Sequence, residues 1–384
     1  MLNDDQRNAF QQFSLFVAGN DKHFVISGAG GTGKSHLMRY IKDNWNQVEV
    51  RVQLLTGDTP RKPLFTATTN EAVFQLGIPE AETIYRLARL RPHGRVLGAY
   101  RSPDHTPYIV FVDEASYIGE QAFKAITKQL PNTKFVWVLD QDQLAPVGEE
   151  LPYVTEQGFK LVELTKIERN QGDLQTLVRT LKQAVRNKEG VDIKSFHNGD
   201  SVQVVDNSTF QQLIVQAYRD NPDIAKVLGY TNAMVDNYNT AINDRVLGNP
   251  SFPYKGASAI VNTSNNFKRF QVGARLDVLG SYIETETHDS IHGEVELAVH
   301  HIVTTGGHLT TFVDKALAKK HKLNSLYTEL SLPYASTTHK AQGSTVPIVF
   351  VDAKEIFSAR DGELRRRLLY VAVSRASHKV IIHL

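Results

Sequence analysis

The chain reads Gly-Ala-Gly-Gly-Thr-Gly-Lys-Ser from Gly28 to Ser35, which fits the pattern G-x-x-x-x-G-K-[S/T]. An apolar run, His23–Ser27, precedes this stretch, and a helical pattern, His36–Trp45, follows it. In that setting glycines let backbone N–H groups turn toward phosphates, Lys34 reaches the terminal phosphates, and Ser35 can ligate Mg²⁺. The expected nucleotide-binding residues of this loop are Gly30, Gly31, Thr32, Gly33, Lys34 and Ser35.

Short apolar runs rich in Val, Ile and Phe recur along the chain and alternate with helical patterns. They are His23–Ser27, Pro63–Ala67, Ile109–Val112, Phe135–Leu139, Val227–Tyr230 and Val346–Val351. Continuous apolar strands separated by helices indicate parallel sheets that are covered on both faces. Since 384 residues are too many for one ordinary domain, the sequence predicts an α/β fold with two main domains.

The alternation of strands and helices is interrupted twice. Residues 87–107 are basic and punctuated by Gly and Pro, and they are too few for a domain, which predicts an inserted hairpin. Residues 249–331 contain alternating stretches such as Ala274–Leu279 and Glu294–His300, as half-buried antiparallel strands do. We expect a small β module inserted into the second α/β domain, with a short Lys-rich helix over Val313–Leu323.

The composition excludes several kinds of chemistry. A net charge of +2 does not indicate a polyanionic partner, so any nucleic-acid groove depends on local placement of charge. The absence of cysteine excludes disulfides, thiolate zinc sites and cysteine nucleophiles. Without a basic-then-apolar N-terminus or a run of about 18 apolar residues, we expect no membrane partner. The expected location is the cytoplasm, or the host's cytoplasm if the chain is viral.

Two further strands end in polar side chains. The run Phe111–Glu114 ends in adjacent carboxylates, of which Asp113 suits the Mg²⁺ shell and Glu114 suits activation of the attacking water. The run Leu139–Gln143 presents polar groups at the carboxyl edge of a sheet, where ligands of open α/β folds bind. Gln143 is therefore a candidate sensor of the γ-phosphate, with an ordinary turn as the alternative.

These three segments, in this order, resemble motifs I, II and III of superfamily 1 helicases, and the likeness covers nearly the whole chain. Asp4–Phe10 is similar to the Q motif, in which Gln6 takes the place of the glutamine that bonds the adenine. Arg169 and Arg375 take the places of two arginines that reach the γ-phosphate from the second motor domain, Arg375 within Leu369–Ala376, which resembles motif VI. The catalytic residues that the resemblance implies are Lys34, Asp113, Glu114, Gln143, Arg169 and Arg375.

The resemblance also implies contacts with a nucleic-acid strand. Thr338–Ser344 is similar to motif V, in which Gly343 approaches the nucleotide phosphates while His339 and Ser344 face the strand. Asn232 lies in a segment similar to the one that opens the second motor domain, and a helix N-cap is the alternative role for it. The implied nucleic-acid contacts are Thr68, Thr69, Asn70, Thr83, Asn232, His339 and Ser344.

The forms of motifs V and VI resemble the 1B branch, the RecD-like and Dda-like helicases. This implies two RecA-like P-loop motor domains, with a β-hairpin inserted in the first and a small SH3-like, barrel-like β module in the second. Leu97 and Tyr100 in the hairpin are candidates for a wedge that splits the duplex, with an ordinary exposed loop as the alternative. The implied boundaries are 1–86 plus 108–160 for domain 1A, 87–107 for the hairpin (1B), 161–248 plus 332–384 for domain 2A, and 249–331 for the β module (2B).

The function implied by the resemblance is that of an ATP- and Mg²⁺-dependent DNA helicase. It would translocate 5′-to-3′ on single-stranded DNA and act on DNA forks as a monomer, with replication or recombination proteins as partners, in DNA replication, recombination or repair. Two alternatives remain open: a DNA-tracking ATPase subunit or remodeller that does not unwind, and an RNA-directed helicase. A phosphate-loop kinase or nucleotide switch is disfavoured, because it predicts no second domain with its own arginines.

Overall fold

The computed structural model of the chain describes residues 2–60, 62–90, 108–144, 152–166, 172–263, 272–290, 293–323 and 327–384. The chain forms two compact units. Unit 1 comprises Met1–Val204, Ala341–Ile348 and Ile356–Ile382, and unit 2 comprises Val205–Lys340, Val349–Glu355 and His383–Leu384. The predicted phosphate-binding loop lies in unit 1.

Unit 1 contains a parallel sheet with the strand order β3-β2-β4-β5-β1-β6. Each neighbouring pair in this order runs parallel, as the continuous apolar runs predict. The strands are β1 (His23–Gly28), β2 (Leu64–Ala67), β3 (Glu82–Thr83), β4 (Tyr108–Asp113), β5 (Thr133–Leu139) and β6 (Lys160–Leu164). Since β1, β4 and β5 are central, their carboxyl ends meet at one edge of the sheet.

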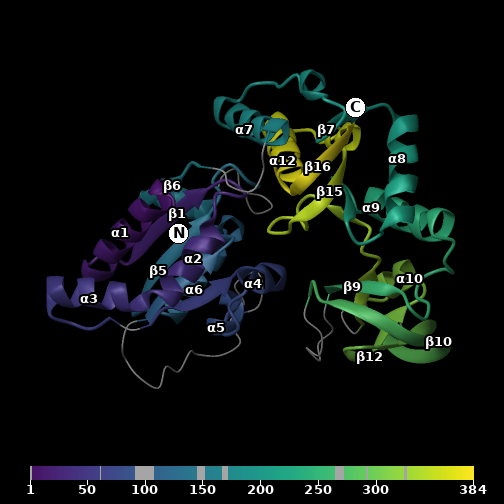
Figure 1. The fold of residues 1–384 in the computed structure, drawn as a ribbon. Helices are drawn as coiled ribbons and strands as arrows, with labels where there is room; N and C mark the ends of the chain where they lie inside the picture. The colour runs from purple at the N-terminus through teal and green to yellow at the C-terminus, as the bar shows by residue number, and fades with distance from the viewer. Residues whose placement is uncertain are drawn as a thin grey trace. The chain divides into compact units, whose positions relative to one another are not determined.

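Helices cover both faces of this sheet (Figure 1). Alternate residues of one strand therefore belong to different cores: Phe24 and Ile26 pack with α1, α2 and α3, whereas Val25 packs with α5 and α6. The helices are α1 (Asp4–Ala18), α2 (Lys34–Asp43), α3 (Trp45–Thr56), α4 (Asn70–Leu76), α5 (Ile84–Leu87) and α6 (Glu120–Gln129), with 3₁₀ turns at Ala115–Tyr117 and Tyr153–Gln157. Unit 1 also contains α7 (Gly172–Asn187), a 3₁₀ turn at Ile193–Phe196 and α12 (Gly362–Ser374).

A second sheet has the strand order β14-β8-β15-β16-β7. Its strands are β7 (Val202–Val205), β8 (Ala225–Gly229), β14 (Ala335–Thr337), β15 (Val346–Asp352) and β16 (Ala376–His383). β14 pairs parallel with β8, and the predicted runs at Val227 and Val346 fall within β8 and β15. In the sequence, β7 is followed by α8 (Asn207–Asp220), β8 by α9 (Asn232–Ala241) with a π-helical turn at Ile242–Val246, and β15 by α11 (Ala353–Ile356).

The β module of unit 2 is an antiparallel sheet with the order β12-β11-β10-β9-β13. Its elements are β9 (Ser258–Thr263), β10 (Arg275–Ser290), β11 (Gly293–Thr304), β12 (Gly307–Phe312), α10 (Lys315–Lys320) and β13 (Glu329–Ser331). The two stretches in which polar and apolar residues alternate fall in paired strands, because β10 and β11 form a long hairpin. The antiparallel pairing is thereby confirmed, whereas an SH3-like barrel remains a prediction.

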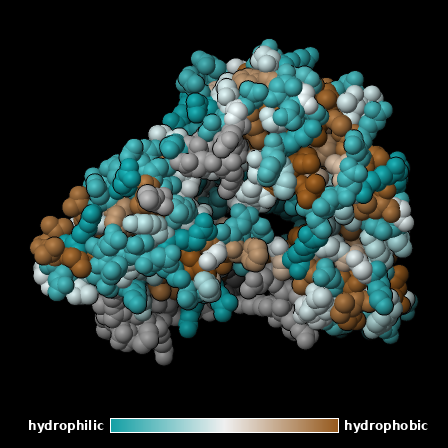
Figure 2. All heavy atoms as spheres, viewed as in Figure 1, coloured by the Kyte–Doolittle hydropathy of each residue, from teal (hydrophilic) through white to brown (hydrophobic). Residues whose placement is uncertain are grey.

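The surface mixes polar and apolar side chains (Figure 2). The apolar area at the left edge of that view lies where α3 runs in Figure 1, and on α3 the side chain of Leu54 is 81% exposed. Within the described ranges, every helix is too short or too polar to cross a lipid bilayer.

Candidate active site

The phosphate-binding loop follows β1 directly and ends at the start of α2. Gly33 caps α2 with a φ of 82°, and Gly31 has a φ of 84°, a left-handed conformation that glycine adopts without steric cost. Nζ of Lys34 donates to the carbonyl oxygens of Gly28 at 2.7 Å and Ala29 at 3.1 Å. The lysine therefore folds back over the loop, in the position where phosphate oxygens can replace the carbonyls as acceptors.

Gln6 packs against this loop from the first turn of α1. Its side chain is buried, and its two amide atoms are both used: Oε1 accepts from Asn3 N at 3.1 Å, and Nε2 donates to Thr32 O at 3.2 Å. The reciprocal bond from Gln6 N to Asn3 makes this a capping box, which fixes the start of α1. The structure thus places Gln6 at the loop, and a bond to adenine stays a prediction.

The two predicted carboxylates lie at the end of β4. Asp113 is buried, and its Oδ1 accepts from the backbone N–H of Glu114, which has a φ of 52°. Burial, and then the charge of Glu114, raise the pKa of Asp113 to about 7, while Lys34 and a hydrogen bond with Ser35 lower it. The hydroxyl of Ser35 and the carboxylate of Asp113 lie close enough to share a hydrogen bond. Since Mg²⁺ prefers oxygen ligands, these two residues fit the donor set of a magnesium site.

Lys34 balances these carboxylates. Burial lowers the pKa of Lys34, and the charges of Asp140, Glu114 and Asp113 oppose that shift. The site therefore carries cationic and anionic groups together, which suits a ligand that combines phosphate charge with a divalent cation.

One pocket in unit 1 brings these residues together. It is lined by Gly31, Gly33, Lys34, Ser35, His36, Arg39, Ala72, Gln75, Asp113, Glu114, Gln143, Gly343 and Arg375. Nine of these were predicted from the sequence, including Gly343 and Arg375 from its last quarter. His36, Arg39, Ala72 and Gln75 were missed, although Arg39 follows Ser35 by one helical turn and so shares its face.

Arg375 follows the last turn of α12 and is buried. Its guanidinium lies beside the loop, since a β-carbon at Gly30 would be 3.3 Å from Nη2 of Arg375. Nη2 donates to Ser374 Oγ at 2.8 Å, and Nη1 donates to Ser344 O at 3.4 Å. Gly343 approaches from the same part of the chain, because a β-carbon there would be 3.6 Å from Oε1 of Glu114.

Gln143 is held in place by its neighbours. Its Nε2 donates to Oδ2 of Asp140 at 3.3 Å, and its Oε1 accepts from Nε2 of Gln342 at 3.3 Å. Arg367 on α12 donates through Nη1 to the backbone oxygens of Gln143 at 2.8 Å and Gln141 at 3.1 Å. Gln143 lies in a turn after β5 and also lines the pocket, and a contact with the γ-phosphate stays a prediction.

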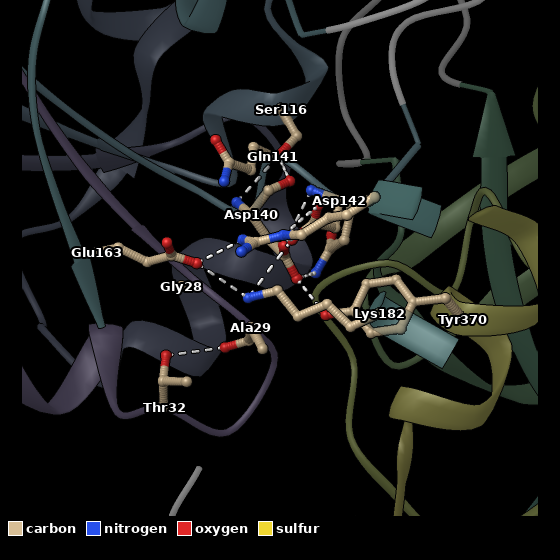
Figure 3. Close-up of polar contacts among 12 residues, drawn as sticks. Gly28, Ala29, Thr32, Ser116, Asp140, Gln141, Asp142, Glu163, Lys182 and Tyr370 are labelled. Carbon is tan, nitrogen blue, oxygen red and sulfur yellow. Dashed lines mark hydrogen bonds and ion pairs between the residues drawn. The ribbon is translucent and has the colours of Figure 1, made fainter. Parts of the chain in front are cut away.

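An ion cluster holds the same loop from α7. Arg186 donates through Nε to both carboxylate oxygens of Asp142, at 3.0 and 2.9 Å, and Lys182 lies 3.4 Å from Asp142. Both basic residues also pair with Glu163 of β6 (Figure 3). Asp142 is buried, and burial raises the pKa of its carboxyl group. Arg186 and Lys182 oppose this shift and compensate the buried negative charge.

The residues predicted to contact nucleic acid occupy several different places. Thr68 is buried and its Oγ1 donates to Glu114 O at 3.1 Å, which ties it to the carboxylate segment. Thr69 and Thr83 cap α4 and α5, and Asn70 is the first residue of α4. Ser344 donates through Oγ to Ala341 O at 2.6 Å.

In unit 2, Asn232 is the first residue of α9. The N-cap of that helix is Thr231, whose side chain accepts from Met234 N, so the alternative that Asn232 is the cap is wrong. The ring of His339 lies 6.3 Å from that of Tyr230, and burial lowers the pKa of His339. Three predicted site residues lie outside the described residues: Arg169, Leu97 and Tyr100.

Comparison with protein families gives two matches. The family described as AAA domain matches residues 1–207, and the family described as UvrD-like helicase C-terminal domain matches residues 332–383. Among curated proteins, the chain is 24% identical to the ATP-dependent DNA helicase dda of Enterobacteria phage T4, over 99% of this chain and 98% of the phage protein.

Solved structures of helicases share the fold. A Pif1 helicase from Bacteroides, solved bound to single-stranded DNA, matches 100% of this chain and 92% of its own with a TM-score of 0.58 and 16% identity. The Pif1 helicase from Candida albicans matches 100% of this chain and 94% of its own with a TM-score of 0.54 and 17% identity. The predicted fold class, two RecA-like domains with parallel sheets, agrees with these neighbours.

Proposed function

Since the chain belongs to the AAA domain family, we propose that it is a superfamily 1B helicase of the Dda-like and Pif1-like kind. Such an enzyme uses ATP to move 5′-to-3′ along single-stranded DNA and to unwind duplex DNA. The observation that carries the proposal is that Arg375 lines the same pocket as Lys34 and Asp113. A site with an arginine from a distant part of the chain is suited to coupling nucleotide state to conformation.

The chemistry follows from the residues around the pocket. The loop and Lys34 bind the phosphates, and Glu114 orients and deprotonates the attacking water. Gln143 contacts the γ-phosphate, and Arg375 stabilises the charge that spreads over the transferring phosphoryl oxygens. Ser35 and Asp113 would hold Mg²⁺, which shields phosphate charge when it is bound with the nucleotide. Gln6 would bond the adenine, and we assign Arg169 as a second arginine on family resemblance.

We propose that the nucleic-acid track involves Asn70, Asn232, His339 and Ser344, together with the helix-capping Thr69 and Thr83. Thr68 belongs to the same track, but its bond to Glu114 O supports a linking role between the strand and the catalytic carboxylate. Contacts of this kind bind phosphates and sugars without reading sequence. The strand would therefore be any single-stranded DNA.

The proposal extends to domains and partners. Residues 1–86 plus 108–160 form motor domain 1A and 161–248 plus 332–384 form 2A, with the hairpin 87–107 and the SH3-like module 249–331 inserted. Leu97 and Tyr100 of the hairpin act as the wedge, so deleting residues 95–100 should abolish unwinding and spare DNA-stimulated ATPase. The enzyme works as a cytoplasmic monomer on single-stranded DNA and forks, beside replication or recombination proteins.

A strand-displacement assay tests this function. Duplexes with a 5′ or a 3′ single-stranded tail are incubated with the protein, ATP and Mg²⁺, and Lys34→Ala serves as the inactive control. Unwinding from the 5′ tail supports the proposal, whereas unwinding from the 3′ tail alone contradicts the polarity. ATPase stimulation by DNA without displacement would indicate a tracking ATPase, and stronger stimulation by RNA would indicate an RNA-directed enzyme.

A further inference from the structure

The hydroxyl of Tyr370 lies at the end of a buried chain of hydrogen bonds that leads to the nucleotide pocket. Tyr370 is on α12 and fully buried, and its O–H donates to Oδ2 of Asp140 at 2.7 Å. Figure 3 shows the ring of Tyr370 pointing toward Asp140, which follows β5. These two residues are 230 positions apart in the sequence, so the bond joins α12 directly to the loop after β5.

The same carboxylate oxygen holds Gln143. Oδ2 of Asp140 also accepts from Nε2 of Gln143 at 3.3 Å, and Gln342 donates to the opposite end of the Gln143 amide. The two contacts fix which way the amide points, and they leave one of its two N–H donors for a ligand. Asp140 and Gln143 are each 1% exposed, so water does not compete for these bonds.

We propose that Tyr370 is a positioning residue for ATP hydrolysis, which acts through Asp140 to hold the amide of Gln143 at the nucleotide pocket. The inference rests on the proposed function, because it presumes that Gln143 contacts the γ-phosphate. Burial, and then the charge of Asp140, raise the pKa of Tyr370 well above its ordinary value, so the hydroxyl keeps its proton and remains a donor.

A second contact from α12 supports this assignment. Arg367 is one turn before Tyr370 on that helix and donates to the backbone oxygens of Gln141 and Gln143. The backbone and the side chain of the loop are thus held from one helix, the backbone by Arg367 and the side chain by Tyr370 through Asp140. Without the hydroxyl, Oδ2 of Asp140 loses its shortest bond while Oδ1 still accepts from Asp142 N at 3.1 Å, so the Gln143 amide is held less firmly and the backbone stays in place.

The test is a double-mutant cycle on DNA-stimulated ATPase. Tyr370→Phe removes only the hydroxyl and keeps the ring. Because a small displacement of a catalytic group lowers the rate, we expect kcat to fall about tenfold while KM for ATP stays nearly unchanged. If Tyr370 acts through Gln143, the pair Tyr370→Phe with Gln143→Ala has the kcat of Gln143→Ala alone. Multiplied losses, or an unchanged kcat in Tyr370→Phe, would overturn the proposal.

The matched control is Tyr218→Phe. Tyr218 is equally buried, and its hydroxyl donates to the backbone oxygens of Tyr334 at 2.6 Å and Ala225 at 3.1 Å, so its loss also removes a buried bond. This variant should keep kcat and lose only thermal stability. If Tyr370→Phe does not fold, Asp140→Asn replaces it in the cycle, since its amide retains the shape and weakens the acceptor. A wild-type chain without DNA-stimulated ATPase would instead refute the proposed function itself.

Discussion

Gln6 lies directly over Gly33, so that a β-carbon at position 33 would overlap Nε2 of Gln6. The same glycine has a φ of 82° and caps α2. Two separate constraints therefore require glycine here, one from the backbone conformation and one from the glutamine that packs on the loop.

Gly33→Ala should weaken ATP binding, because the methyl group displaces the Gln6 amide from Thr32 O and strains the loop. The left-handed conformation alone costs an alanine about 1–2 kcal/mol. Gly57→Ala is the control, since Gly57 has a φ of 78° and no atom within 4 Å of its added β-carbon. Titration with a fluorescent ATP analogue should show weaker binding in the first variant alone, and equal losses of stability and normal binding in both would contradict the steric argument.

Glu114→Gln should bind ATP and fail to hydrolyse it. The amide preserves the volume of the side chain but cannot accept the proton of the attacking water, and loss of a general base lowers the rate by about 10²–10⁴-fold. Steady-state ATPase rates and equilibrium binding of ATP measure the two effects separately. A variant that turns over normally would exclude Glu114 as the base.

Arg375→Ala should lower kcat on the order of 10³-fold, because a guanidinium that stabilises phosphoryl-transfer charge is lost. Arg275→Ala is the control, since Arg275 pairs with Asp223 in an exposed ion pair. Rapid-quench measurement of ATP hydrolysis on single-stranded DNA distinguishes the variants. Full DNA-dependent turnover in Arg375→Ala would revive a simple nucleotide switch as the function.

His23 should make unit 1 less stable in acid. Its ring stacks on Phe159 at a centroid distance of 4.4 Å, and its Nδ1 accepts from Nε1 of Trp137 at 3.2 Å. Burial lowers its pKa below the ordinary 6.5, so the unfolded chain binds the proton more readily. Stability from this group is complete above pH 6.5 and is lost as the pH falls through the folded-state pKa.

Urea denaturation at pH 7.5 and 5.5 measures this effect. Trp45 and Trp137 are the chain's two tryptophans and both lie in unit 1, so their fluorescence follows that unit. His23→Phe should reduce the difference between the two pH values, whereas replacement of the exposed His378 by Asn should leave it unchanged. An equal pH difference in wild type and His23→Phe would show that His23 is not responsible.

The local parts of the site could be predicted from the sequence because their signals are local. The loop before Lys34 needs a strand, glycines and a helix within a short stretch, and the structure has all three. Arg375 and Gly343 were found through family resemblance, and both line the pocket with Lys34 and Glu114. Spacing within the sequence alone would not have joined them.

The supporting contacts could not be predicted, because they depend on how α12 is rotated about its axis. A tyrosine in an apolar run such as the one around Tyr370 indicates only burial, and its bond to Asp140 requires the tertiary structure. Thr68 shows the same limit: family resemblance implies a contact with the strand, which stays a prediction, and the bond from its side chain to the backbone of Glu114 depends on the tertiary structure.

α12 combines three contacts on a single helix. Arg367 holds the backbone of the loop after β5, Tyr370 holds Asp140 in that loop, and Arg375 follows the last turn beside Gly30. A helix is stiff along its axis, so a displacement that moves the arginine also pulls on the loop. We therefore expect Arg375 and Gln143 to move together. A state with Arg375 docked and Gln143 released would not be populated.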